Sequence, residues 1–405
     1  MLLTLLSLRS YAEGGIIEVC STCPIQSIKT AIEQADEGDE IRIHSGTYRE
    51  GTIVVNKSLV LTGLDYPILD GEGAYEILTV TAANVTIQGL HLHNTGNSYL
   101  EDRAALRIKR QKNFTIRNNR LTNTFFGIYL EKAGNGIVEG NQIIGLAENE
   151  MSSGNAIHAW HCRKIAVKNN LVIGHRDGIY FEFVDSSQVI DNRSERNLRY
   201  GLHFMFSNYD SYSCNEFWDN GAGVAVMFSK FIEMTENLFI QNWGRSSYGL
   251  LLKEIYDATI LDNQFLENTI GINIEGSTRI NYLGNRFVRN GWAVKMAGGC
   301  LNNNFHQNNF IANTLDLVVS SKINNNSFDG NYWSEYSGYD LNYDGIGDVP
   351  YRPVKLFAYI LDQTPESIVL LRSLFIDLLN FSEKVSPVFT PADVLDHQPK
   401  IDILP

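Results

Sequence analysis

Polar and apolar residues alternate in short runs along most of the chain, and asparagine and glycine interrupt these runs at regular intervals. An asparagine followed closely by an apolar residue occurs at Asn119, Asn141, Asn170, Asn192, Asn215, Asn237, Asn263, Asn285 and Asn309. A glycine that opens an apolar run occurs at Gly127, Gly178, Gly201, Gly223, Gly249 and Gly271. From Asn192 and Gly178 onward, both series advance by 23, 22, 26 and 22 residues. Two markers in the same register predict a solenoid of stacked units of ~22 residues.

The residues inside each unit favour β-strands. Val, Ile, Phe and Tyr form short alternating runs that end at Asn or Gly, which is typical of strands joined by tight turns. A leucine-rich repeat of the same length would need a regular leucine pattern, which is missing. The fold class that we expect is therefore all-β, a parallel β-helix over 13–335 whose stacked asparagine side chains hydrogen-bond from coil to coil.

The two ends of such a stack expose strand edges that need a cover. Near the N-terminal end, Ile28, Ala31, Ile32 and Ala35 have helical spacing, and Gly38 ends the run. This pattern predicts a cap helix on the first coil.

A C-terminal extension is expected over 336–405. The apolar segment 364–381 predicts a helix with Thr364 as its N-cap and Pro365 in its first turn. This helix is either a packed cap or a docking helix for a membrane partner. From Pro387 to the last residue, four prolines predict a tail that runs extended over the surface.

The position of each side chain on its strand predicts which face it occupies, because neighbouring side chains on a strand alternate. Counted from the repeat glycines, the first and third positions are uniformly apolar and should point inward. The second and fourth positions are mixed and should point outward. His203 is at a second position, whereas Met205 and Met227 are at fourth positions in neighbouring coils, so these three should lie together on the outer wall. Met234 and Met296 fall at inward positions and should be core residues.

Thioether sulfur together with imidazole nitrogen is a soft ligand set, which suits Cu(I) better than Mg²⁺ or Ca²⁺. In the preceding coil, Glu182 is the neighbour of Met205 and Tyr180 is the neighbour of His203, and His158 lies one coil earlier still. The sequence therefore predicts a transient Cu(I) site whose candidate ligands are His203, Met205, Met227, Glu182 and His158.

The same residues have an alternative interpretation as a contact patch for a partner protein. Phe206 and Phe228 each follow one of the two methionines, so that the surface would be apolar and adaptable. Arg176 and Arg199 occupy equivalent turn positions two residues before a repeat glycine, and we expect them to contact a partner or to shape the turn.

A second candidate metal site lies in the segment "DLNYDGIGD", where oxygen-bearing residues alternate before Gly345. Alternating oxygen ligands followed by glycine are typical of calcium loops, although Tyr351 stands where an EF-hand has its bidentate glutamate. The alternative is a turn that is rich in Asp and Asn and holds no metal. The candidate calcium ligands are Asp340, Asn342, Asp344 and Asp348.

Composition narrows the range of partners. The net charge of −13 argues against a nucleic-acid partner, because phosphate binding requires clustered Lys and Arg. No apolar stretch reaches the ~20 residues of a membrane span. Residues 1–12 resemble a truncated export signal without its basic region. Cys20 and Cys23 form either a local disulfide or two free thiols.

Four stretches resemble the NosD family, which matures the copper sites of nitrous oxide reductase: "HRDGIYFEF", "NLRYGLHFMFSN", "NGAGVAVMFSK" and "GNYWSEYSGYDLNYDGIGDVPYRP". The resemblance covers about residues 15 to 400. It implies a right-handed parallel β-helix in the periplasm that is not a catalyst. It also implies work with an ABC-type permease and its ATPase, a copper-chaperone lipoprotein and nitrous oxide reductase, with copper or a sulfur species as cargo.

The strongest rival is a β-helix enzyme that acts on polysaccharides: a lyase, a hydrolase or an epimerase. A hydrolase of this kind needs two carboxyl groups about 5 to 9.5 Å apart. The outward residues Glu131, Asp177 and Glu182 are the candidates, but the columns contain no tight pair of aspartates.

Overall fold

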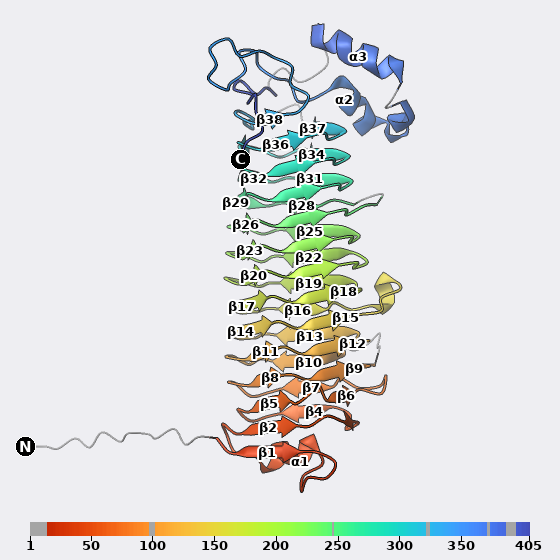
Figure 1. Cartoon of the computed structure of the whole chain (residues 1–405), viewed down its shortest axis with the longest axis vertical. Coiled ribbons are helices and arrows are strands. Elements are labelled where there is room, and N and C mark those ends of the chain that lie inside the picture. The colour runs from red at the N-terminus through yellow and green to blue at the C-terminus, as the bar shows by residue number, and fades with distance from the viewer. Residues whose placement is uncertain (1–13, 97–101, 245–246, 321–324, 371–372, 386–393) are drawn as a thin grey trace, which may run out of the picture.

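The structure is a computed structural model that describes residues 14–96, 102–244, 247–320, 325–370, 373–385 and 394–405. The chain winds into a long stack of coils, with helix α1 at one end and helices α2 and α3 at the other (Figure 1). Three parallel sheets form the walls of the stack, which confirms the all-β parallel β-helix. The predicted signal segment 1–12 lies outside the described residues.

The first and third sheets contain 13 strands each. The first sheet consists of β1 (Ile16–Val19), β2 (Glu40–Ile43), β5 (Val60–Gly63), β8 (Thr86–Gln88), β11 (Thr115–Arg117), β14 (Gly134–Glu139), β17 (Arg163–Lys168), β20 (Gln188–Ile190), β23 (Ser211–Ser213), β26 (Glu233–Thr235), β29 (Tyr256–Leu261), β32 (Thr278–Leu283) and β35 (Asn304–His306). The third sheet consists of β3 (Thr47–Tyr48), β6 (Ile68–Asp70), β9 (His91–His93), β12 (Arg120–Thr122), β15 (Gln142–Ile144), β18 (Leu171–Ile173), β21 (Arg193–Glu195), β24 (Glu216–Trp218), β27 (Leu238–Ile240), β30 (Gln264–Leu266), β33 (Arg286–Val288), β36 (Asn309–Ile311) and β38 (Tyr332–Trp333).

The second sheet has 12 strands and carries the repeat glycines. It consists of β4 (Ile53–Val55), β7 (Leu78–Val80), β10 (Ala104–Lys109), β13 (Phe126–Glu131), β16 (Ile157–Trp160), β19 (Asp177–Glu182), β22 (Tyr200–Met205), β25 (Ala222–Met227), β28 (Leu250–Lys253), β31 (Ile270–Glu275), β34 (Trp292–Met296) and β37 (Leu315–Val319). The repeat glycines are needed because coils approach closely here: a Cβ on Gly223 would come within 2.4 Å of the carbonyl oxygen of Gly249.

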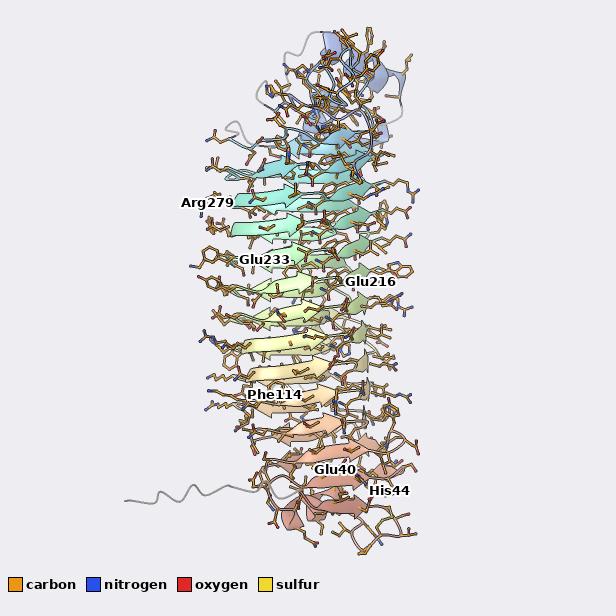
Figure 2. The ribbon with its side chains drawn as sticks, turned by 60° about the vertical axis from the view of Figure 1, so that its left-hand side comes forward. Glu40, His44, Phe114, Glu216, Glu233 and Arg279 are labelled. Carbon is orange, nitrogen blue, oxygen red and sulfur yellow. A yellow bond between two sulfur atoms is a disulfide. The ribbon has the colours of Figure 1, made fainter. Side chains whose placement is uncertain are left out.

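The interior of the coils is filled by in-register columns of apolar side chains, and charged side chains such as Glu216, Glu233 and Arg279 project from the outside (Figure 2). Met234 and Met296 are buried, as predicted. One aromatic column runs through six coils, with centroids of neighbouring rings 4.1 to 5.4 Å apart. Its members are Phe217, Phe239, Phe265, Phe287, Phe310 and Trp333.

From Asn119 onward, buried asparagines link each coil to the next, as predicted. The amide nitrogen of Asn215, for example, donates to Oδ1 of Asn237 at 3.0 Å, and the same oxygen accepts from the Asn215 side chain. The predicted last member was wrong: Asn285 donates to Asn308, and Asn309 instead begins β36. The repeat steps cannot separate two adjacent asparagines. A second ladder was missed and consists of Asn197, Asn220, Asn242, Asn268, Asn290 and Asn313.

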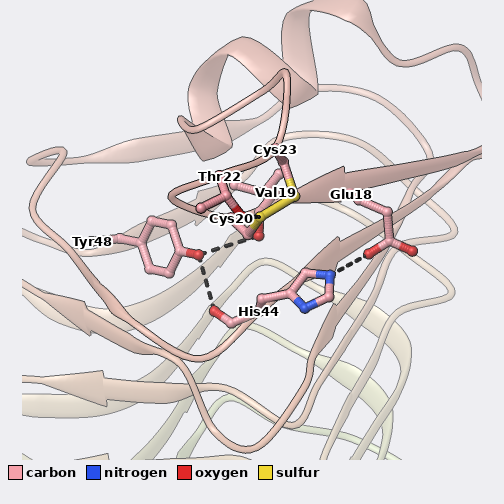
Figure 3. The surroundings of a disulfide bond; sticks show 7 residues. All are labelled: Glu18, Val19, Cys20, Thr22, Cys23, His44 and Tyr48. Carbon is pink, nitrogen blue, oxygen red and sulfur yellow. Dashed lines mark hydrogen bonds and ion pairs between the residues drawn. A yellow bond between two sulfur atoms is a disulfide. The ribbon is translucent and has the colours of Figure 1, made fainter.

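The predicted N-terminal cap is helix α1 (Ile28–Gln34), which packs three buried side chains on the first coil. The backbone N–H of its first residue, Ile28, has no acceptor within the helix and donates to Oε1 of Glu50 at 2.8 Å. Cys20 and Cys23 form a disulfide in the adjoining turn (Figure 3). Of the two alternatives for the CxxC segment, the structure contains the disulfide.

The C-terminal helices differ from the prediction. Helix α2 spans Leu356–Gln363 and ends at Thr364, which is its C-cap, so the predicted role of Thr364 as an N-cap was wrong. The ring of Pro365 cannot continue α2, and the chain forms a 3-10 turn over Pro365–Leu370 before α3 (Leu374–Val385). A second 3-10 turn, Glu150–Ser152, lies in a loop of the stack. Helix α2 packs on β37 and thereby covers the end of the second sheet.

The described part of the predicted tail, residues 394–405, runs along the last coil, and residues 387–393 lie outside the described residues. It does more than lie on the surface, because Asp396 is fully buried. Its carboxylate accepts hydrogen bonds from the backbone amides of Gly330 and Asn331 and from Nε1 of Trp333, all within 2.9 Å. The tail therefore terminates the asparagine ladder with a carboxylate.

Candidate functional site

The strands of the second sheet bring the predicted copper candidates into adjacent coils. Met205 pairs with Met227 in register, and Glu182 pairs with Met205 from the other side. The inward neighbours Leu202 and Phe204 are fully buried in the core. The side chains of Met205 and Met227, called the methionine pair below, therefore lie next to each other on the outer wall and are half-buried.

His203 lies on the same outer wall, but it is covered rather than open to solvent. His203 is only 5% exposed, because the rings of Tyr180 and Tyr200 flank its imidazole. Each of their centroids lies 4.8 Å from the centroid of the imidazole. Both of its ring nitrogens are buried without a hydrogen-bond partner. The closest carboxylate oxygen belongs to Asp177, 4.0 Å from Nδ1. A buried imidazole with two unpaired nitrogens is unusual, since buried polar groups are normally hydrogen-bonded.

Tyr180 connects the histidine to the methionine pair. Its hydroxyl lies 3.8 Å from Sδ of Met205, and its ring contacts His203. Burial, followed by the nearby charge of Glu182, raises the pKa of Tyr180 well above its usual value. The phenol therefore stays protonated at neutral pH and can donate to the thioether. Tyr180 lies beside His203 from the preceding coil, as strand register predicts, whereas the contact of Tyr200 with His203 was not expected.

His158 and Arg176 are occupied by internal contacts. Nδ1 of His158 lies 3.0 Å from the Asn155 amide nitrogen, and Tyr180 stands between His158 and His203 in the column. Burial, assisted by Arg176, lowers the pKa of His158 to about 3, so this imidazole is neutral. Arg176 in turn donates to Oδ1 of Asn155 at 3.2 Å.

Arg199 forms a bidentate ion pair with Asp177, which is fully buried. Burial opposes ionisation of this carboxyl group, but the hydrogen bonds and charge of Arg199, together with the neighbouring His203, outweigh it and lower the pKa of Asp177. Arg199 therefore neutralises the buried carboxylate of Asp177, which lies 4.0 Å from Nδ1 of His203. Whether Arg199 also contacts a partner stays a prediction.

Phe206 and Phe228 belong to an exposed aromatic column at the turn that follows the second sheet. The column consists of His161, Phe183, Phe206 and Phe228, whose stacked rings are 4.6 to 5.2 Å apart. All four residues have φ between 51° and 54°, so the left-handed turn conformation repeats in each coil and aligns the rings. The two phenylalanines that follow the methionine pair are about two-fifths exposed. Their role as partner contacts stays a prediction.

A metal site on this wall would need methionine sulfur among its ligands. Among the residues that the structure describes, no group of three or more His, Cys, Asp or Glu side chains could hold a metal. The Cys162 thiol is buried, which raises its pKa to about 11, so it is no thiolate ligand at neutral pH. A copper site on this wall would therefore be of thioether and imidazole type.

The calcium candidates lie together in one exposed loop, where they act as hydrogen-bond acceptors for the loop itself. Asp340 accepts from the amide of Gly345 at 2.8 Å, and Asp348 accepts from the amide of Leu341 at 2.7 Å. Asn342 donates to Asp344 at 2.9 Å. These contacts are those of a turn rich in Asp and Asn. Calcium binding at this loop stays a prediction.

The carboxyl groups that an enzyme would use are engaged elsewhere. Asp177 is paired with Arg199, and Glu131 lies within 3.8 Å of Arg107 and 3.5 Å of Arg110. Glu182 lies between its register neighbours Trp160 and Met205. None of these contacts forms a pair of opposed carboxyl groups of the kind that hydrolases use.

Comparison with known proteins gives two kinds of result. Residues 146–338 match the family model described as periplasmic copper-binding protein (NosD). Proteins named probable ABC transporter binding protein NosD, from Pseudomonas aeruginosa and Stutzerimonas stutzeri, are 29% and 28% identical to this chain. These alignments cover 90% and 92% of this chain and 89% of each relative.

Solved structures share the fold at low sequence identity. A family 28 exopolygalacturonase from Yersinia enterocolitica has a TM-score of 0.64 at 12% identity, with 79% of each chain covered. The A-module of the mannuronan C-5 epimerase AlgE4 from Azotobacter vinelandii has a TM-score of 0.52 at 14% identity, covering 75% of this chain and 87% of the module. At such identities these similarities concern the fold alone.

The relatives that share sequence are named as binding proteins, which agrees with a non-enzymatic role. None of the described helices is long and apolar enough to cross a membrane. The family model covers the methionine pair, His203 and the coils around them. Together with the relatives that align over nearly the whole chain, it supports the resemblance of this chain to NosD proteins.

Proposed function

We propose that this protein is a periplasmic, non-enzymatic scaffold that accepts Cu(I) through the methionine pair and His203. The observation that supports this is the placement of two thioethers in neighbouring coils beside an imidazole whose nitrogens lack partners. The copper, or a sulfur species carried with it, would go to the assembly of the copper centre of nitrous oxide reductase. A copper-chaperone lipoprotein would supply it.

The donor set fits Cu(I) as cargo. Thioether sulfur and neutral imidazole nitrogen are soft ligands that need no deprotonation, so binding releases no proton from the methionines. Glu182 adds a carboxylate next to Met205. The partly buried thioethers border solvent, which gives a donor or acceptor protein access to the ion. His158 is separated from His203 by Tyr180 and is therefore a secondary candidate.

Replacement of both methionines by leucine is expected to weaken Cu(I) binding by about tenfold or more, because leucine keeps the apolar volume and removes the sulfur. Binding is measured anaerobically by competition with a chromophoric Cu(I) chelator. Met151→Leu is the matched control, since Met151 is 87% exposed and lies outside the site. Unchanged affinity in Met205→Leu/Met227→Leu would contradict the proposed site.

We further infer that α3 docks the protein onto the permease of an ABC-type transporter and its ATPase. The helix packs Ile376 against the α2 region, yet its other face is apolar and exposed. Leu374, Phe375, Leu378 and Phe381 are between 59% and 73% exposed on that face. A large exposed apolar face is typical of an interaction site, and the relatives are named after ABC transporter binding.

The double variant Phe375→Ser/Phe381→Ser is expected to lose most of its binding to the detergent-solubilised permease–ATPase complex in a pull-down with purified components. Because both rings face solvent, folding stability should be unchanged. Leu146→Ser, at an exposed leucine in a loop of the stack, is the control. Equal recovery of the double variant and the wild type would exclude α3 as the docking helix.

A further inference from the structure

A second group of metal-ligating side chains lies on the third sheet, many coils from the methionine pair. Strand β9 has the sequence His-Leu-His, and Leu92 points into the core with no exposure. Because side chains alternate along a strand, His91 and His93 both lie on the outer wall. Their rings are half-buried, with centroids 5.7 Å apart.

The two imidazoles converge on a single atom of the next coil. Thr122 is the register partner of His93 on β12. Its hydroxyl oxygen lies 2.7 Å from Nε2 of His91 and 2.8 Å from Nδ1 of His93. A hydroxyl has one proton and can donate to only one of the two rings. When the hydroxyl donates to one imidazole nitrogen, it accepts from the N–H of the other. Both ring nitrogens are therefore directed at the same oxygen atom.

Two charged residues of neighbouring coils lie next to this His pair, and each has another contact. Asp70 is the register neighbour of His93 in the preceding coil, and it forms an ion pair with Arg49 at 3.1 Å. Arg120, the neighbour of His91 in the next coil, places its guanidinium 3.8 Å from the centroid of the Tyr66 ring. Arg120 keeps its positive charge beside His91, so binding of a cation here depends on the two imidazole nitrogens.

We propose that His91 and His93 form a second metal site, which takes a divalent cation of borderline softness such as Cu²⁺ or Zn²⁺. Two imidazole nitrogens directed at one point match the ligand preference of these ions, whereas Cu(I) would favour the sulfurs of the methionine pair. The ion would take the place between the two rings that the Thr122 hydroxyl now bridges. Zinc–nitrogen bonds of ~2.0–2.1 Å are shorter than the present nitrogen–oxygen contacts, so the two rings would move closer to the ion than they now are to the hydroxyl. This site is independent of the proposed function.

The test is a titration of untagged, full-length protein with CuSO₄ in air, followed by electron paramagnetic resonance, and a parallel calorimetric titration with Zn²⁺. The wild type is expected to show a Cu²⁺ signal with nitrogen hyperfine structure. In His91→Gln/His93→Gln, this signal should disappear and the affinity should fall by about tenfold or more. His44→Gln is the control, because His44 is also a partly exposed histidine of the stack and is bonded to Glu18 at 2.6 Å (Figure 3).

The outcomes separate the two sites. Retention of the Cu²⁺ signal in Met205→Leu/Met227→Leu supports a separate histidine site, whatever that variant does to Cu(I). A Cu²⁺ signal that survives His91→Gln/His93→Gln, or that is lost equally in His44→Gln, would overturn the proposal. The circular dichroism spectra of all variants are compared first, so that a misfolded variant is replaced by the single substitution His91→Gln.

Discussion

Replacement of Asp396 by alanine is expected to destabilise the last coil of the β-helix by about 3–5 kcal/mol. The substitution leaves the amides of Gly330 and Asn331 and the indole nitrogen of Trp333 without their acceptor. Each buried donor left unpaired costs about 1–3 kcal/mol, and solvent that enters the opened end compensates part of the sum. Because a solenoid is stabilised mainly by contacts between neighbouring coils, the loss should stay near this end.

Hydrogen exchange followed by mass spectrometry measures this effect directly. Peptides that contain residues 330–333 should lose protection, while those from the middle of the stack should keep it. Asp402→Ala is the matched control, since Asp402 is an exposed carboxylate of the same tail. Protection that is unchanged in Asp396→Ala would mean that the tail does not hold the last coil.

Replacement of Phe265 by alanine is expected to cost about 3–5 kcal/mol in the free energy of unfolding, as for other large buried aromatic residues. Phe265 is fully buried between Phe239 and Phe287, with ring centroids 4.6 and 4.9 Å away. Alanine leaves a cavity, and the rings above and below cannot close it because their coils are fixed by the asparagine ladders on either side.

Urea denaturation monitored by circular dichroism tests this prediction. Phe381→Ala serves as control, because Phe381 is 67% exposed on α3 and contributes little burial to folding. A midpoint for Phe265→Ala equal to that of the control would show that the aromatic column adds little to stability. Both variants can be prepared together with the docking variants of α3.

The repeat could be predicted from the sequence because most coils need a glycine at one position and an asparagine at another. The glycine positions and most of the asparagine positions follow from contacts that recur in every coil, so their spacing is visible in the sequence. The ends could not be predicted in the same way. Thr364 has the residue type of an N-cap, but the apolar run before it forms α2, and packing on β37 decides where that helix lies. The role of Asp396 carries no local signal, because the donors of the last coil that it accepts from, Gly330, Asn331 and Trp333, are more than 60 residues away.

For the candidate site, alternation along the strand predicted which residues share the outer wall. The register of His203 with Tyr180, and of Met205 with Met227, agrees with that prediction. Alternation says nothing about how far a neighbouring side chain leans over, and so the burial of His203 by Tyr180 and Tyr200 was not foreseen. The ion pair between Asp177 and Arg199 joins adjacent coils and depends on rotamers that no spacing reveals.

The buried carboxylate of the tail also sets an order of events during biosynthesis. A growing chain emerges from the ribosome with its N-terminal part first, and each finished coil can serve as a template for the next. The coil that contains Trp333 lacks its final acceptor until residue 396 has been made. The last coil is therefore completed only after residue 396 has been added, and a chain cut short before it would carry an open edge where another chain could add.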